Sequence, residues 1–393
     1  MNTLRKIYCR AFQKAFHIAI PFLPYRKPKI AGSVKELPEI IMRHKCTHVL
    51  LITDGGIMKL GLTRRLEKAL KEAGIPYTIY DKTVANPTTV NVREALELYH
   101  KEGCDAIIGF GGGSSMDCAK AVGACAVKPN QSLAQMKGIL KIHKKLPLLI
   151  AIPTTAGTGS EVTCVSVLSD HANGKKAPIV SEGFYPAAAI IDPELTYTMP
   201  PQVTAGTGID VLSHAIEGYW SKGHQPICDV LAMHAAELVF KYVYRAYRKP
   251  DDEEAREKMC EASLIAGLAF TLPKTTSSHA CSFPLTNIYH IPHGEACGLT
   301  LDYFIRINAK GEGGERVEEF ARRIGFKDAE EMADAVLELK KKMGLRCDLK
   351  DLELDDDQIA ELVRISRHPN LYNNPVEITD EMLDEMYRYL AGK

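Results

Sequence analysis

The sequence predicts a chain of two parts, an α/β domain with a doubly wound, mostly parallel sheet and an all-α domain after it. Short β-rich runs alternate with amphipathic helical stretches up to about residue 200, as in βαβ units. After Met199-Pro200-Pro201 strand signals become scarce and long amphipathic stretches follow one another. We therefore expect an α/β domain at 1–200 and an all-helical domain at 201–393, with a ligand cleft at their junction.

The strands of the first domain are expected at short β-rich runs: 48–53, 77–81, 106–110, 146–152, and VSVLS, APIVS and AAAII within 164–191. Apolar residues at helical spacing predict helices at 59–73, at 90–103 and from Met116. In the second half the same spacing predicts helices at 202–222, 226–247, 252–272, 295–310, 328–344, 356–367 and 379–391. Asp328 and Thr379 are suitable helix N-caps.

Composition excludes several classes of protein. Lys+Arg and Asp+Glu number 49 each, so no basic surface for nucleic acid or an anionic membrane is expected. Apolar runs such as LPLLIAIP are far shorter than the roughly 18 residues of a spanning helix. The 11 cysteines are dispersed without a CxxC pair, which indicates reduced thiols and a cytoplasmic location. They read as buried hydrophobes, although oxidation of Cys281 or Cys297 could inactivate the protein.

The first 30 residues are basic and aromatic, and they contain no acidic residue. A transit peptide is one interpretation, but the segment lacks serine and continues through PFLPYRKP toward the first domain. We interpret residues 1–34 as an N-terminal arm that packs on the body or on a neighbouring subunit. A homodimer is the default expectation for the assembly.

Two glycine-rich loops follow predicted strands. GFGGGSSMDCAK begins a helix, and glycines there let a backbone approach a diphosphate at a helix N-terminus. IPTTAGTGSEVT offers hydroxyls and glycines for phosphate and ribose oxygens. The first loop is neither a GxGxxG nor a Walker sequence, and GGGSS alone could be a structural turn. Two such loops at the ends of strands in one sheet predict a nucleotide crevice.

Asp54 ends the first clear strand. A carboxylate at this position can accept both ribose hydroxyls of an adenosine and would repel a 2′-phosphate, which favours NAD over NADP. A turn-forming Asp before Gly-Gly is an equally good interpretation.

Asp210 and His214 lie four residues apart on a predicted helix, so they share a face and can bind one ion from one side. His279 and His293, far along the chain, would complete a site of one carboxylate and three imidazoles. This donor set suits Fe(II) or Zn(II) and leaves room for a substrate oxygen. Asp210 and His214 alone would be an ordinary helix pair. His290 could line the site without binding the ion.

With these motifs in place, the chain resembles the iron-containing (group III) alcohol dehydrogenases from about Lys35 onward. The resemblance rests on VLLITD, NPT at 86–88, the two glycine-rich loops, MPP, TGIDVLSHAIEGY and IPHGEACG. It implies the fold shared with dehydroquinate synthase, with an NAD(P)-binding α/β domain and a helical metal domain. The metal ligands it implies are Asp210, His214, His279 and His293. The cofactor contacts it implies are Asp54, Asn86, Gly112, Gly113, Ser114, Thr154, Thr155, Thr158, Thr163 and, less securely, Lys176.

The chain departs from the family at Phe283, where many members carry a second histidine four residues after the third ligand. Proton transfer must then use water, a ribose hydroxyl or His290, or dispense with a relay. The resemblance implies a metal-dependent, NAD(H)-linked oxidoreductase that interconverts a small alcohol and its aldehyde or ketone by direct hydride transfer. Fe(II) is the expected ion and Zn(II) the second candidate.

The absence of Arg from 203–220 and 275–300, with only Lys274 nearby, favours a neutral substrate over an anionic one. Same-fold lyases of the dehydroquinate-synthase kind and hydroxyacid–oxoacid transhydrogenases, which act on anionic substrates, are the alternatives. A non-catalytic nucleotide-binding protein is the third hypothesis.

Overall fold

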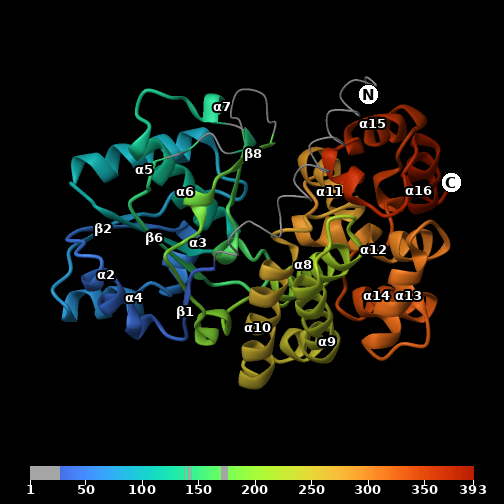
Figure 1. Ribbon diagram of the computed structural model, residues 1–393, viewed down its shortest axis with the longest axis horizontal. Helices are drawn as coiled ribbons and strands as arrows, with labels where there is room; N and C mark the ends of the chain where they lie inside the picture. The colour runs from blue at the N-terminus through green and yellow to red at the C-terminus, as the bar shows by residue number, and fades with distance from the viewer. Residues whose placement is uncertain (1–26, 137, 140–141, 143, 170–175) are drawn as a thin grey trace. The chain divides into compact units, whose positions relative to one another are not determined.

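The computed structural model describes residues 27–136, 138, 139, 142, 144–169 and 176–393, with backbone alone at 139, 176 and 177 (Figure 1). These residues form two compact units, whose described parts are 27–199 and 200–393. Of the expected N-terminal arm, residues 1–26 lie outside the described residues.

The first unit is built on a six-stranded sheet with the strand order β1-β9-β6-β4-β2-β3. Every neighbouring pair in it is parallel, as predicted. Its strands are β1 (Lys29–Ala31), β2 (Val49–Ile52), β3 (Tyr77–Tyr80), β4 (Ala106–Gly111), β6 (Leu148–Pro153) and β9 (Ala188–Ile190). Strand β1 was not predicted, because its three residues lie in a basic segment that we interpreted as an arm.

Helices cover both faces of this sheet (Figure 1). Side chains of β2 alternate between two hydrophobic cores: Leu50 and Ile52 pack in one, and Val49 and Leu51 in the other. The helices of this unit are α2 (Leu37–Arg43), α3 (Gly55–Leu60), α4 (Arg64–Glu72), α5 (Thr89–Lys101), α6 (Gly113–Val127) and α7 (Leu133–Met136). The first core includes residues of α5 and α6, and the second includes residues of α2 and α4.

The helix predicted at 59–73 is wrong in one respect, because the chain forms two helices there. Gly61 ends α3 with a φ of 67°, and α4 begins at Arg64. Glycine adopts this left-handed conformation without steric cost, so the helix stops and the chain turns.

A second, three-stranded sheet lies in the same unit, in the order β5-β8-β7. Its strands are β5 (Gly138–Ile139), β7 (Val165–Ser169) and β8 (Lys176–Val180), and β7 and β8 are antiparallel. The strand pair predicted from VSVLS and APIVS is confirmed.

The second unit contains only helices among its described residues. They are α8 (Pro201–Trp220), α9 (Pro226–Arg248), α10 (Glu253–Phe270), α11 (Ser277–Tyr289), α12 (His293–Lys310), α13 (Gly314–Arg323), α14 (Ala329–Lys342), α15 (Asp356–Ser366) and α16 (Asp380–Ala391). The predicted caps are confirmed, since Asp328 and Thr379 accept the N–H groups of Glu331 and Met382. Helices α11 and α13 were not predicted.

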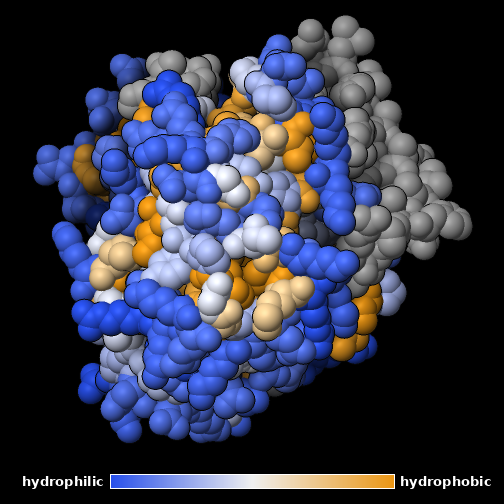
Figure 2. Space-filling view, turned by 90° about the vertical axis from the view of Figure 1, so that its left-hand side faces the viewer, coloured by the Kyte–Doolittle hydropathy of each residue, from blue (hydrophilic) through white to orange (hydrophobic). Residues whose placement is uncertain are grey.

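Short 3₁₀ helices complete the chain: η2 (Val34–Glu36), η3 (Ser160–Val162), η4 (Glu182–Phe184), η5 (Pro193–Thr196), η6 (Lys350–Leu352) and η7 (Pro369–Asn373). Within the described residues, no helix is both long enough and apolar enough to cross a membrane. The face in Figure 2 is mainly hydrophilic, with hydrophobic residues in small patches.

Candidate metal centre and nucleotide-binding loops

Helices α8 and α12 cross at glycines, and this crossing brings the distant ligand segments together. A Cβ on Gly294 would lie 2.1 Å from the backbone oxygen of Gly206, and one on Gly298 would lie 2.1 Å from Cγ2 of Ile209. Because no side chain intervenes, the two backbones approach closely. Asp210 on α8 and His293 at the start of α12 therefore share one site.

Four potential ligand atoms gather there, from Asp210, His279, His293 and Cys297, all within 4.8 Å of one another. Oδ1 of Asp210 lies 3.5 Å from Nε2 of His279. Asp210, His279 and Cys297 are buried, and His293 is partly buried. Three of the four predicted ligands thus converge, together with a cysteine that was not among them.

His214, the fourth predicted ligand, lies next to these four residues but is not one of the set whose ligand atoms are all within 4.8 Å of one another. Its Nδ1 lies 4.0 Å from Oδ1 of Asp210. Its ring stands 4.6 Å from that of His279 and stacks on Phe270 at 4.1 Å. Phe270, at the end of α10, covers the imidazole and limits how its ring can turn.

The donor set fits a divalent cation. Oδ1 of Asp210 and Nε2 of His279 are buried and have no hydrogen-bond partner among the described residues. Burial by itself would raise the pKa of Asp210, but the nearby histidines, His214 first, lower it well below its ordinary value. An ionised carboxylate and an imidazole nitrogen left unpaired in the interior are costly unless something satisfies them, and a bound ion would do so.

Glu217 holds His279 in place, a role that the sequence analysis missed. Its buried carboxylate contacts Nδ1 of His279. It also accepts hydrogen bonds from the hydroxyl of Thr276 at 2.8 Å and from the backbone N–H of Ser278 at 2.6 Å. Burial raises the pKa of Glu217, but His279 and these hydrogen bonds lower it below its ordinary value. A hydrogen on Nδ1 directs the lone pair of Nε2 toward Asp210.

Replacing Glu217 with Gln is expected to lower metal affinity by about 10- to 100-fold, because the hydrogen bond to His279 loses its charge. Competition with a chromophoric chelator measures this affinity in purified protein. Unchanged affinity would mean that Glu217 serves packing alone.

Phe283, at the position where the family resemblance implied a histidine, lies against another imidazole. Its ring centroid is 4.5 Å from that of His368, at the start of η7. Burial lowers the pKa of His368 to about 4, and its Nδ1 accepts the N–H of Asn370. His290, the expected alternative, ends α11 with a φ of 56° and is exposed.

The predicted nucleotide loops meet at the carboxyl ends of β2, β4 and β6. The chain passes from β2 to β3 on one side of β2 and then crosses to β4 on its other side. The position between β2 and β4 is therefore a topological switch point of the sheet. Thr154 donates its backbone N–H to the carbonyl of Gly111 at 3.0 Å. A Cβ on Gly113 would lie 2.9 Å from Cγ2 of Thr158, so only glycine allows the second loop this close to the first.

The remaining predicted cofactor residues lie around the same edge. The backbone N–H of Asn86 donates to Oγ of Ser114 at 3.2 Å. Ideal Cβ positions on Gly112 and Gly111 would lie 3.7 Å from Oγ1 of Thr155 and 3.6 Å from Oδ2 of Asp54. Lys176 begins β8, but its side chain lies outside the described residues.

Asp54 combines both interpretations of its role. Its Oδ1 caps α3 by accepting the N–H groups of Gly56 and Ile57 at 2.8 and 3.0 Å, as a turn residue would. Its Oδ2 lies toward the glycine-rich loop after β4. One carboxylate oxygen therefore fixes the turn, and the other faces the loop expected to bind a nucleotide.

A buried lysine ties the two loops together, and the sequence analysis missed this role too. Nζ of Lys120 donates to the carbonyl and Oγ of Ser160 at 2.7 and 2.8 Å and to the carbonyl of Val165. Oγ of Ser160 donates to Asp117, and Oγ1 of Thr163 lies 3.3 Å from the same ammonium. Thr163 is thus occupied in holding the loop. The pair Asp117 and Lys120, one turn apart in DCAK, was the available signal.

Glu161, in the second loop, predicts a pH-dependent stability. Burial raises its pKa from 4.5 to about 7, and a backbone hydrogen bond and the nearby Lys120 only partly oppose this rise. Between these values the unfolded chain ionises while the folded one stays protonated, so stability falls as pH rises, by about 3 kcal/mol in total. Glu161→Gln should therefore stabilise the protein at pH 8 relative to wild type, and little at pH 4. Urea unfolding at both pH values tests this, and an equal effect at both would contradict it.

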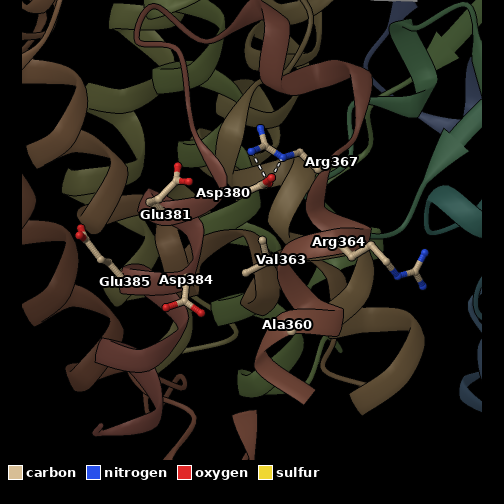
Figure 3. A pocket seen from close by; sticks show the side chains of 8 residues that line it. All are labelled: Ala360, Val363, Arg364, Arg367, Asp380, Glu381, Asp384 and Glu385. Atoms are coloured by element: carbon tan, nitrogen blue, oxygen red, sulfur yellow. Dashed lines mark hydrogen bonds and ion pairs between the residues drawn. The ribbon is translucent and has the colours of Figure 1, made fainter. Parts of the chain in front are cut away.

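A groove of about 800 Å³ lies elsewhere in the helical unit, between α15 and α16 (Figure 3). Charged side chains line most of it, and Arg367 pairs there with Asp380. It includes none of the predicted ligands or cofactor contacts. Its charged side chains are exposed or partly exposed, which makes it an ordinary solvated surface groove.

Comparison with known proteins places these features in context. Residues 30–193 match the family described as iron-containing alcohol dehydrogenase, and residues 204–391 match its C-terminal family. Alcohol dehydrogenase 4 of Schizosaccharomyces pombe is 32% identical, with 95% of this chain and 90% of the relative covered. The 1,3-propanediol dehydrogenase of Citrobacter freundii is 34% identical, and the match covers 95% of this chain and 98% of the relative. A solved structure of sulfoacetaldehyde reductase from Bifidobacterium kashiwanohense in complex with NAD+ is 55% identical in sequence and superposes with a TM-score of 0.87. The match covers 94% of this chain and 99% of that chain.

Proposed function

Because this chain belongs to the iron-containing alcohol dehydrogenase family, whose members use NAD(H) and a divalent metal, we propose that it reduces sulfoacetaldehyde to the corresponding alcohol. The family establishes an oxidoreductase of alcohols and aldehydes. The matches give no support to the lyase or transhydrogenase alternatives.

One observation carries the choice of substrate. The sulfoacetaldehyde reductase is 55% identical over nearly its whole length, whereas the alcohol and propanediol dehydrogenases are 32% and 34% identical. A neutral alcohol is the second candidate. It is favoured by the absence of Arg from 203–220 and 275–300, the segments that carry the ligand cluster.

In the mechanism we propose, Asp210, His214, His279 and His293 hold the divalent ion. The ion supplies Lewis acidity toward the substrate oxygen, and bound NAD(H) supplies or accepts the hydride. The protein provides charge and orientation. Asp210 offsets the charge of the cation, and Glu217 fixes the ring of His279. The N–H groups at the start of α6 and the glycines beside them receive the diphosphate.

A panel of aldehydes tests the substrate. Purified protein loaded anaerobically with Fe(II), or with Zn(II), is assayed for NADH oxidation with sulfoacetaldehyde, acetaldehyde and the neutral methylsulfonyl analogue of sulfoacetaldehyde. We expect kcat/KM for sulfoacetaldehyde to exceed that for either neutral aldehyde by about 100-fold or more, because a site built for a polar group discriminates strongly. Equal or greater efficiency with the neutral aldehydes would instead support the second candidate. Metal analysis of anaerobically purified protein distinguishes Fe(II) from Zn(II).

The preference for NAD(H) gives a further prediction, on Asp54. Asp54→Gly and Asp54→Asn both remove the charge that would repel a 2′-phosphate, and Asn keeps an oxygen to cap α3. Both variants should shift the ratio of kcat/KM for NADPH to that for NADH upward by about tenfold. If neither variant moves this ratio, Asp54 is a turn residue only.

Homodimer formation and a cytoplasmic location are the remaining parts of this proposal. Sedimentation velocity measures the first, and fluorescence microscopy of a tagged chain measures the second.

A further inference from the structure

The thiol of Cys297 lies among the proposed metal ligands. Cys297 is one turn beyond His293 on α12, is fully buried, and places Sγ 3.8 Å from Nε2 of that histidine. Its Sγ belongs to the set of four ligand atoms that all lie within 4.8 Å of one another. Two other members of the set, Oδ1 of Asp210 and Nε2 of His279, are buried without a hydrogen-bond partner among the described residues.

These separations match those between ligands of one ion. Neighbouring donors of a four- or five-coordinate ion, at about 2.0–2.1 Å for nitrogen or oxygen and about 2.3 Å for sulfur, are roughly 2.8–3.8 Å apart. The Asp210–His279 distance is 3.5 Å and the Cys297–His293 distance is 3.8 Å. His214, by contrast, approaches Asp210 only to 4.0 Å. The sulfur is therefore positioned for the ion at least as closely as the fourth predicted ligand.

Hydrogen bonds around His293 support this arrangement. The hydroxyl of Ser282 donates to the carbonyl of His279 at 2.8 Å, so its oxygen is left to accept from Nδ1 of His293, 3.4 Å away. With the hydrogen on Nδ1, Nε2 keeps its lone pair. This nitrogen is the one nearer to the sulfur of Cys297, at 3.8 Å against 4.0 Å for Nδ1.

We propose that Cys297 is a sulfur ligand of this metal centre, in addition to the histidines and Asp210. This inference rests on the proposed function, because it concerns the same ion. A sulfur ligand selects ions that bind thiolates, such as Fe(II), Co(II) and Zn(II), over Mg(II) and Ca(II). It also places a thiol beside the metal, where an oxidant that attacks the sulfur would release the ion.

Cobalt substitution tests the ligand directly. Metal-free protein is titrated with Co(II), and the near-ultraviolet absorption is recorded, where a sulfur bound to cobalt gives a charge-transfer band. Wild type should show the band at one equivalent of Co(II). Cys297→Ala and Cys297→Ser should lack it and bind Co(II) about tenfold more weakly or worse. Cys281→Ala is the matched control, since Cys281 is equally buried on α11 but lies outside the set of four.

The outcomes separate this inference from the function it rests on. A wild-type protein that binds one Co(II) and oxidises NADH with an aldehyde, but shows no band, overturns the role of Cys297 alone. A band that persists in both Cys297 variants overturns it as well. Failure of the wild type to bind Co(II) overturns the metal centre and with it the proposed mechanism.

Discussion

His279→Ala is expected to release the metal and to lower NADH-linked turnover by about a thousandfold or more, with NADH binding unchanged. The buried imidazole offers its Nε2 3.5 Å from Oδ1 of Asp210, and Glu217 fixes its orientation. Removing it takes away a ligand and leaves two carboxylates without their shared partner. Loss of Lewis-acid stabilisation worth several kcal/mol corresponds to a rate effect of this size. The loops expected to bind NADH lie in the other unit.

Three measurements test this prediction. Mass spectrometry gives the metal content, a steady-state assay gives the turnover of NADH, and fluorescence titration gives the affinity for NADH. His279→Gln is a second variant, which keeps a hydrogen-bond donor for Glu217 and so separates ligand loss from unfolding. His234→Ala is the control, because that histidine is half exposed on α9. A His279 variant that keeps one metal per chain and nearly normal turnover would rule out the proposed ligand set.

Much of the fold could be predicted because the pattern of apolar and polar residues in most elements reflects which of their faces are buried. The strands of the parallel sheet are buried on both faces and read as continuous apolar runs, as in VLLI of β2. Helix α11 was missed for the opposite reason. Nine of its residues are buried, which leaves it little amphipathic spacing, and Pro284 within it argues against a helix. Packing against neighbouring helices stabilises α11 despite its weak amphipathic pattern and its proline.

The residues of the candidate site likewise fall into those that the sequence predicted and those that it missed. Asp210 and the histidines were predicted from the i,i+4 spacing of Asp210 and His214, combined with two further histidines in a distant segment and the glycines that flank both segments. The roles of Glu217 and Lys120 were missed because they depend on partners far along the chain. Lys120 looks like a surface lysine on α6 until its contacts with Ser160 and Val165 are known. No spacing rule connects residues about 40 positions apart.

Gly294→Ala is expected to weaken metal binding by about 100-fold and to destabilise the metal-free protein by about 3 kcal/mol. The added Cβ would lie 2.1 Å from the backbone oxygen of Gly206 and 3.0 Å from Cβ of Asp210. A backbone atom cannot rotate away, so α12 must move from α8. That movement separates His293 and Cys297 from Asp210. Chelator competition and urea unfolding measure the two effects.

Gly206→Ala is the matched control at the same crossing, because its added Cβ would come no nearer than 3.9 Å, to the backbone nitrogen of Glu295. Helix propensity alone predicts that either glycine-to-alanine change stabilises its helix by up to about 1 kcal/mol. The packing predicts opposite results for the two positions, with Gly206→Ala tolerated and Gly294→Ala severe. Similar behaviour of the two variants would mean that the close approach of α8 and α12 does not assemble the ligand cluster. A selective loss of metal in Gly294→Ala would show that a glycine without any chemical function of its own sets the geometry of the centre.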